Sequence, residues 1–216
     1  DCENKAPGKG KNVLILEALY PKLTSPAEVS SERLRDQLAA KTWPNQTSRL
    51  NLVSNLAGEF WGSSKTSRDL SNEVDYQALL AYRSRSSVII TSAATARVDQ
   101  YYLTSFAPLV FVSQSGDFSD IPALTELTET KQNAETWREP TGRWNVRELA
   151  RQRNWPRVLF ETGPTLSKVL IESGQVDSVM LTITDAGTLS PESACDRALG
   201  VLGASNRDLV WADRVD

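Results

Sequence analysis

A glycine–proline pair between two apolar segments offers a place where an anion could bind. Residues 159–174 read LFETGPTLSKVLIESG, so an apolar run ends in polar residues and a stretch with one apolar face begins after Gly163-Pro164. Proline in the first position of a helix loses no hydrogen bond, because that amide has no partner inside the helix. The amides near Thr165 and Leu166 would then point outward with partial positive charge, which suits a phosphate. The plain alternative is that glycine and proline only start a helix.

A second pair of polar side chains follows another apolar run. The segment SVIITS (87–92) is of the continuous apolar kind found in strands covered on both faces, and Thr95 and Asp99 come shortly after it. The Thr95 hydroxyl can donate or accept a hydrogen bond, and the Asp99 carboxylate can accept one from a ribose or an amine. The alternative for this segment is a capped loop that carries a solvated acid.

The composition excludes several classes of catalysis. The 216 residues include no histidine, which excludes Ser-His-Asp and Cys-His catalysis and zinc sites built on imidazole. The cysteines Cys2 and Cys195 have no spacing typical of a metal site or a disulfide framework, so we expect no metal and a reducing, cytoplasmic location. The chemistry must therefore use carboxylates, hydroxyls, lysine, arginine or a bound cofactor.

Charge and hydropathy point to a small molecule as the partner. The net charge is −3 and no basic stripe is visible, which argues against nucleic acid or an anionic membrane surface. No apolar run reaches the length of a membrane span. With 40% hydrophobic residues, we expect one globular domain over residues 12–216 after a disordered polar tail of residues 1–11.

Apolar runs alternate with segments of helical period along the chain. We expect strands near residues 50, 88, 109, 158, 179 and 210. We expect helices over residues 30–40, 71–85, 145–152 and 164–173. This alternation predicts a three-layer α/β domain with a mostly parallel central sheet. Such sheets bind ligands beyond the carboxyl ends of their strands, so a site is expected in the loops after residues 54, 91, 113 and 161.

Four local features complete this prediction. The run 12–20 fits either a strand or a short helix, and Ser71 is a candidate cap for the helix over 71–85. The segment 92–102 is expected to be a loop. The segment 115–143 is polar and broken by prolines, so we expect it at the surface.

Four blocks follow one another in a familiar order within residues 48–184. They read RLNLVSNLAGEFWG, TSRDLSNEVDYQALLAYRSRSSVIITSAATARVDQYY, APLVFVS and VLFETGPTLSKVLIESGQVDSVMLTIT. Together they resemble the reductase domain of riboflavin biosynthesis, the pyrimidine reductase family. The resemblance implies a dihydrofolate reductase-like fold, NADPH as cofactor, a phosphorylated ribosylamino-pyrimidine as substrate, and a homodimer. The runs 178–184 and 209–215 are candidates for the sheet edge that would form this dimer.

The resemblance also implies roles for individual residues. Contacts to NADPH are implied for Thr95, Asp99, Ser113, Gly163, Pro164, Thr165 and Leu166. Contacts to the substrate are implied for Ser67, for Arg83 on the substrate phosphate, and for Glu161. Because no histidine is present, the proton would come from water or from a carboxyl such as Asp99. For Arg83 the alternative is a cation at a helix C-terminus on a solvated face.

Some residues depart from the family pattern, mostly on the substrate side. Asn51, Asn55 and Ala57 stand where the family has lysine, serine and an acid, and Thr162 stands where a glycine is usual. The leading hypothesis is an NADPH-dependent reductase. A second hypothesis is a non-catalytic, nucleotide- or pyrimidine-binding member of the same fold. A third is a reductase of a different small carbonyl or imine.

Overall fold

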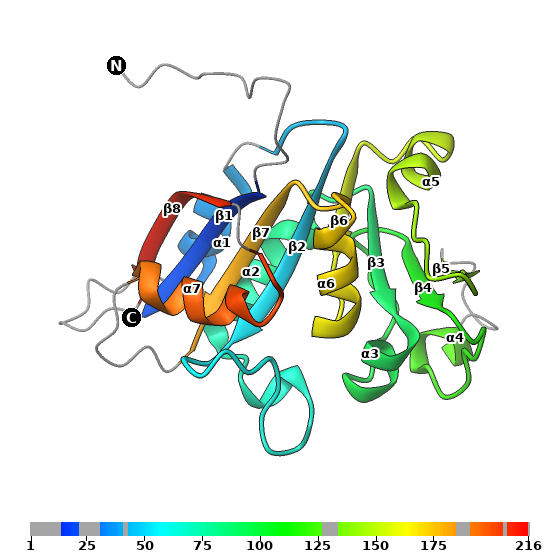
Figure 1. Cartoon of the computed structure of the whole chain (residues 1–216), viewed down its shortest axis with the longest axis horizontal. Coiled ribbons are helices and arrows are strands. Elements are labelled where there is room, and N and C mark those ends of the chain that lie inside the picture. Colours follow the sequence, from blue (N-terminus) through cyan, green and yellow to red (C-terminus); the bar gives the residue numbers. More distant parts are fainter. Residues whose placement is uncertain are drawn as a thin grey trace.

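One eight-stranded sheet runs through the protein. The computed structural model describes residues 14–21, 31–40, 43–126, 134–184, 191–204 and 207–215. The strands lie in the order β5-β4-β3-β6-β2-β7-β1-β8 (Figure 1), and each neighbouring pair in this described sheet is parallel. The predicted α/β class with a mostly parallel sheet is therefore confirmed. The tail predicted over residues 1–11 lies outside the described residues.

The elements alternate along the chain much as predicted. The strands are β1 (Leu14–Pro21), β2 (Thr47–Ser54), β3 (Val88–Ser92), β4 (Leu109–Ser113), β5 (Ala134–Arg138), β6 (Arg157–Phe160), β7 (Ser178–Ile183) and β8 (Arg207–Val215). The helices are α1 (Ser31–Ala40), α2 (Glu73–Arg83), α3 (Ala93–Val98), α4 (Pro122–Glu126), α5 (Val146–Gln152), α6 (Pro164–Glu172) and α7 (Pro191–Gly200), with a single 3₁₀ turn at Ser67–Asp69. Among the described helices, none combines the length and the apolar character needed to cross a bilayer.

Two hydrophobic clusters, one on each face of the sheet, make the three layers. Side chains of α5, α6 and α7 pack on one face of the strands, and side chains of α1, α2, α3 and α4 pack on the other. Figure 1 shows α6 and α7 in front of the sheet and α1 and α2 behind it. Neighbouring strand residues alternate between the faces: Ile89 belongs to the α2 cluster and Ile90 to the α6 cluster, as do Leu159 and Phe160 respectively. This alternation follows from the period of two along a strand, and it explains why these central strands read as continuous apolar runs.

The structure corrects the prediction for one segment and shows elements that were not predicted in another. Residues 92–102 contain helix α3 rather than only a loop, because the Ser92 hydroxyl caps it by accepting from the Thr95 amide at 3.0 Å. Residues 115–143 contain α4 and the edge strand β5, whose side chains are mostly exposed and therefore show no apolar run. Helix α7 was not predicted either.

Three further predictions are settled by the structure. The run 12–20 forms a strand, β1. Helix α2 is capped by Asn72, whose side chain accepts from the Asp75 amide at 3.0 Å, and Ser71 instead donates to the Asp75 carboxylate. The run 178–184 is not a sheet edge, because β7 lies between β2 and β1; of the two candidates, only β8 is an edge strand.

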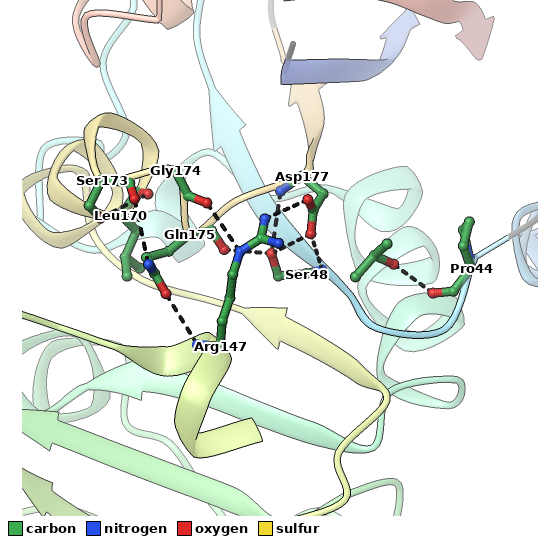
Figure 2. A network of polar contacts seen from close by, with 9 residues as sticks. Pro44, Ser48, Arg147, Leu170, Ser173, Gly174, Gln175 and Asp177 are labelled. Atoms are coloured by element: carbon green, nitrogen blue, oxygen red, sulfur yellow. Dashed lines mark hydrogen bonds and ion pairs between the residues drawn. The ribbon is translucent and has the colours of Figure 1, made fainter. Parts of the chain in front are cut away.

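A closed network of polar contacts ties the amino ends of β2 and β7 to the neighbouring helices (Figure 2). Asp177 accepts from the Ser48 amide at 2.8 Å and forms an ion pair with Arg147. Arg147 also donates to the Gly174 carbonyl at 3.1 Å, and its amide donates to the Gln175 side chain at 3.1 Å. We call these five residues the amino-end network. It holds α5 and the end of α6 against the sheet.

Candidate functional site

A large cavity lies at the opposite end, beyond the carboxyl ends of the strands. It is a cleft of about 1100 Å³ between the segments that follow β2, β3, β4 and β6, where the sequence placed a site. All ten residues predicted to contact a ligand line this cleft: Ser67, Arg83, Thr95, Asp99, Ser113, Glu161, Gly163, Pro164, Thr165 and Leu166. The structure thus brings them together, and their individual roles stay predictions.

The amino terminus of α6 opens onto this cleft. Gly163 is the N-cap, Pro164 opens the helix, and no side-chain hydrogen bond from the described residues caps it. The Gly163 amide donates to Thr95 Oγ1 at 3.0 Å, so the start of α6 directly abuts α3. A Cβ on Gly163 would lie 3.1 Å from that hydroxyl, which is too tight for ordinary packing. The uncapped end of a nine-residue helix, with its partial positive charge, suits an anion.

Two buried hydroxyls fix the turn that leads into α6. Thr162 Oγ1 and Ser167 Oγ lie 2.8 Å apart, and Ser167 Oγ donates to the Thr162 carbonyl at 2.9 Å. Both side chains are buried. Thr162, which stands where the resemblance would place a glycine, therefore holds the turn in shape.

The hydroxyl of Thr95 joins the two turns that border the cleft. It lies 2.8 Å from Ser92 Oγ and accepts from the Gly163 amide. Ser113, at the end of β4, accepts from the Gly116 amide at 3.1 Å and lies at another side of the same cleft. Hydroxyls from the ends of two neighbouring strands, β3 and β4, thus line the cleft onto which α6 opens.

Asp99 ends α3 and anchors the long polar loop that follows β2. Its carboxylate accepts from Ser67 Oγ at 2.9 Å, from the Ser67 amide at 3.1 Å and from Thr66 Oγ1. Three donors already occupy its two oxygens. This arrangement suits an anchor of the loop better than a donor of protons. The contact with Asp99 also holds Ser67 at the cleft. The distance between these two residues in the sequence could not predict this contact.

The floor of the cleft is a buried ion pair. Arg83 Nε and Nη2 donate to the two carboxylate oxygens of Glu161 at 2.8 and 2.6 Å, and Tyr101 donates to Glu161 Oε2 at 2.7 Å. The side chains of Arg83 and Glu161 are only 18% and 3% exposed, so Arg83 does not lie on a solvated face. Burial lowers the pKa of Arg83, but attraction and hydrogen bonding to Glu161 outweigh it and raise that pKa. Burial, followed by the Glu161 charge, raises the pKa of Tyr101.

Sequence analysis missed an acid in the cleft, Asp75. Its side chain is buried, its Oδ2 accepts from Ser71 Oγ at 2.7 Å, and its Oδ1 has no partner among the described residues. Burial raises the pKa of Asp75, the hydroxyls of Ser71 and Thr182 lower it, and repulsion by Glu161 raises it. An acid in the first turn of a helix is ordinary, so the sequence carried no signal. Asp75 belongs to no group of three ligand side chains that could hold a metal, and no such group occurs in the described residues.

Apolar side chains gather around the mouth of the cleft. Six large ones are exposed although they line it: Trp61, Tyr76, Val98, Tyr102, Phe106 and Val169. Exposed apolar groups that cluster in this way mark binding surfaces, and aromatic faces stack on flat rings. The cleft therefore combines a helix end that suits an anion, a polar floor and an apolar rim.

Comparisons with known proteins support the fold. Neither a family model nor a curated protein matches the sequence. A solved structure of a pyrimidine reductase-like protein from Corynebacterium diphtheriae matches with a TM-score of 0.56 and 16% identity, over 73% of this chain and 83% of that one. The riboflavin biosynthesis reductase of Saccharomyces cerevisiae matches with a TM-score of 0.49 and 16% identity, over 69% and 80%. The bacterial structure shows that this chain has the fold of a pyrimidine reductase-like protein, the three-layer dihydrofolate reductase-like fold that the resemblance implied.

Proposed function

We propose that the protein is an NADPH-dependent reductase of a phosphorylated ribosylamino-pyrimidine or a related small heterocycle. The observation that carries this proposal is the contact between two turns in one cleft. The uncapped start of α6 meets the Thr95 hydroxyl through the Gly163 amide, beside the carboxyl ends of parallel strands. Such a place, where backbone amides and hydroxyls converge, is where α/β sheets hold the phosphates of nucleotides.

The dimensions of the cleft suit a dinucleotide together with a second small molecule. Its volume of about 1100 Å³ exceeds what one drug-sized ligand usually fills. The amides of Thr165 and Leu166 would hold the diphosphate, and Thr95 and Ser113 would bind beside it. A close approach is possible because Gly163 has no side chain. Asp99 would act mainly through the loop that it anchors.

The protein's part in the reaction is to orient two flat molecules and exclude water. The reduced nicotinamide supplies the hydride when it is bound. The rim aromatics Trp61 and Tyr102 would stack on a ring, and the Arg83–Glu161 pair would fix the polar side of the substrate. Arg83 keeps one amino group, Nη1, outside its contact with Glu161, so a substrate phosphate would share the guanidinium with that acid.

The test is a titration of the full chain with NADPH and NADH, followed by the change in tryptophan fluorescence and the shift in melting temperature. Gly163→Val should weaken NADPH binding by about tenfold or more, because a side chain there blocks the approach to α6. Gly200→Val is the matched control, since a Cβ on Gly200 meets nothing within 4 Å. If neither nucleotide binds at millimolar concentration, the proposal is wrong. NADPH oxidation in the presence of a phosphorylated ribosylamino-pyrimidine then tests catalytic turnover.

A binding protein without catalysis is the second candidate. It is favoured by the pairing of Arg83 with Glu161, which leaves the proposed phosphate ligand partly neutralised before any substrate arrives. Binding of NADPH without its oxidation by any substrate tested would support this candidate over the enzyme.

The proposal includes a homodimer in the cytoplasm. The edge strand β8 remains a candidate for the dimer contact, because an edge strand presents unpaired backbone groups to a second copy. Sedimentation of the full chain at increasing concentration tests the oligomeric state.

A further inference from the structure

A second cavity lies between α5 and the amino ends of three strands, and the proposed reaction does not use it. Its volume is about 310 Å³, and it shares no lining residue with the cleft. Its polar lining includes Ser48 near the start of β2 and Asp177 before β7. Its apolar lining consists of Val146, Ala150, Trp155 and Val158. The cavity is therefore a separate place for a ligand or a partner.

The chain around this second cavity is basic, although the whole protein is acidic. Residues 134–157 contain six arginines and three acids, a net charge of +3, whereas the net charge of the full chain is −3. The other residues therefore carry a net charge of −6. Because the arginines are interspersed with acids, they form no continuous basic run in the sequence. Positive charge is nevertheless concentrated around β5, α5 and the start of β6.

Three of these arginines surround the second cavity. Arg147 and Arg151 line it, and the Arg153 guanidinium lies 5.6 Å from the centre of the Trp155 ring, which also lines it. The side chains of the three arginines are 46%, 70% and 47% exposed, so solvent reaches all of them. We call Arg147, Arg151 and Arg153 the arginine surface.

Each arginine of the arginine surface has an acidic partner but keeps donors outside that pair. The pairs are Arg147–Asp177, Arg151–Glu148 and Arg153–Glu135. Arg147 and Arg151 use Nε and Nη2 in their contacts, and Nη1 of each makes no hydrogen bond with the described residues. Exposed ion pairs contribute little to stability, so an incoming carboxylate would displace Glu148 or Glu135 at little cost. The arginine surface is therefore available to an external anion.

We propose that the arginine surface and the second cavity bind a short acidic peptide segment of a partner protein. Carboxylates of the segment would pair with the guanidinium groups, whose parallel N–H donors match the two oxygens of a carboxylate. One apolar side chain between these carboxylates would enter the second cavity beside Trp155 and Val158. The seven residues of α5 span about 10 Å, so an extended segment of about five residues would cover the surface. The proposal does not depend on the proposed function.

The charge of the rest of the chain favours a short peptide over a nucleic acid. A long polyanion would extend beyond the arginine surface and meet residues whose net charge is −6, whereas a short segment would not. The apolar lining of the second cavity also suits an aliphatic side chain. Glu135, Glu148 and Asp177 reduce the positive potential at the surface. We therefore expect a modest affinity that falls as the salt concentration rises.

The experiment measures the binding of a fluorescent peptide, with four glutamates on each side of one leucine, to the full chain by fluorescence anisotropy. The control peptide has glutamine in place of every glutamate. At low salt we expect the acidic peptide to bind at least about tenfold more tightly, a difference of about 1.4 kcal/mol. This preference should disappear at about 0.5 M salt, where charges are screened over a few ångströms.

Variants of the protein and of the peptide locate the contact. Arg151→Gln/Arg153→Gln should weaken binding of the acidic peptide by about tenfold, because each substitution removes one charge from the surface. Arg35→Gln is the matched control, since Arg35 is an exposed arginine on α1, and it should leave the affinity unchanged. Serine in place of the central leucine should weaken binding by about threefold or more, because the apolar contact in the second cavity is lost.

Each outcome decides the proposal. Equal binding of the acidic and neutral peptides, or an unchanged affinity of folded Arg151→Gln/Arg153→Gln, overturns it. If the double variant fails to fold by circular dichroism, the two single variants decide. An oligothymidylate of the same charge that binds more tightly than the peptide would overturn the choice of a peptide in favour of a nucleic acid. Equal affinity of the serine and leucine peptides would overturn the role of the second cavity.

Discussion

Two aspartates beside the same pair of strands, at opposite ends of the sheet, have very different surroundings. Asp177, before β7, accepts from the Ser48 amide and hydroxyl and pairs with Arg147 (Figure 2). Asp75, in the cleft at the other end, has the Ser71 hydroxyl as the donor to one oxygen, and its other oxygen makes no aligned hydrogen bond with any described residue. The Asp177 carboxylate is therefore part of a closed network, whereas one oxygen of Asp75 lacks an aligned hydrogen bond among the described residues.

The difference indicates what each end of the sheet contributes. A network in which each polar group has a partner adds stability and needs nothing from outside the protein. Buried acceptors without partners lower stability, and such violations concentrate at sites that bind ligands. The amino ends of β2 and β7 therefore hold the fold together, whereas their carboxyl ends keep polar atoms available for a ligand.

The largest expected effect comes from the ion pair in the cleft, which resembles the amino-end network in being closed. Arg83→Leu should lower the free energy of unfolding by about 3–5 kcal/mol, because it leaves the Glu161 charge buried without its cation. Urea denaturation measures this loss. The double variant Arg83→Leu/Glu161→Gln should recover much of it. If the double variant is no more stable than the single one, the unpaired charge was not the cause.

The amino-end network should show the next largest effect. Asp177→Ala should cost about 1–2 kcal/mol of unfolding free energy, because the Ser48 amide and Arg147 lose their acceptor while some water can reach them. NADPH binding should not change. The matched control is Asp117→Ala, which removes an exposed pair with Arg97 and should cost less. Equal losses in both variants would show that the amino-end network adds nothing beyond a surface ion pair.

Asp75→Asn should not lower the free energy of unfolding at neutral pH, in contrast to Asp177→Ala. The folded pKa of Asp75 is raised above its unfolded value, so the native state holds more protons and stability falls as pH rises between the two values. Asparagine removes this cost, still accepts from Ser71, and offers an NH₂ group to the neighbouring oxygens. We expect the melting temperature to equal or exceed that of the wild type at neutral pH. We also expect a flatter pH dependence of stability.

The comparison of Asp75→Asn with Asp177→Asn makes the test sharp, because both variants make the same chemical change. Asp177→Asn should lower the melting temperature, since it removes the charge that pairs with Arg147. If Asp75→Asn lowers the melting temperature by as much at neutral pH, the carboxylates at the two ends of the sheet contribute equally to stability.

Local sequence patterns were enough to predict most of the fold and the location of the cleft. Apolar runs of five or six residues, such as 87–92 and 178–183, are strong signals for buried strands, because both of their faces are covered. The order of strands and helices then placed the ends of these strands at one edge. Gly163-Pro164 marked the start of α6 correctly, since both residues have conformational reasons to stand there.

Contacts between distant residues could not be predicted in the same way. Arg83 and Glu161 are 78 residues apart, and nothing in the sequence indicates that they form an ion pair. The open oxygen of Asp75 depends on which strand lies under α2. The short helix α3 was missed because six residues carry too little periodicity to separate a helix from a loop.

The smallest effect on global stability is expected at Asp99, whose carboxylate, like that of Glu161, already accepts hydrogen bonds within the cleft. Asp99→Ala removes the acceptor of the Ser67 amide and of two hydroxyls in the polar loop. Loops open locally with little change in the global transition, so the free energy of unfolding should change by about 1 kcal/mol or less. Hydrogen exchange of the Ser67 amide should accelerate, while exchange in α5 stays the same. Unchanged exchange at Ser67 would show that the loop holds its own shape, and Asp99 would then be free for the direct contact with NADPH that the sequence predicted.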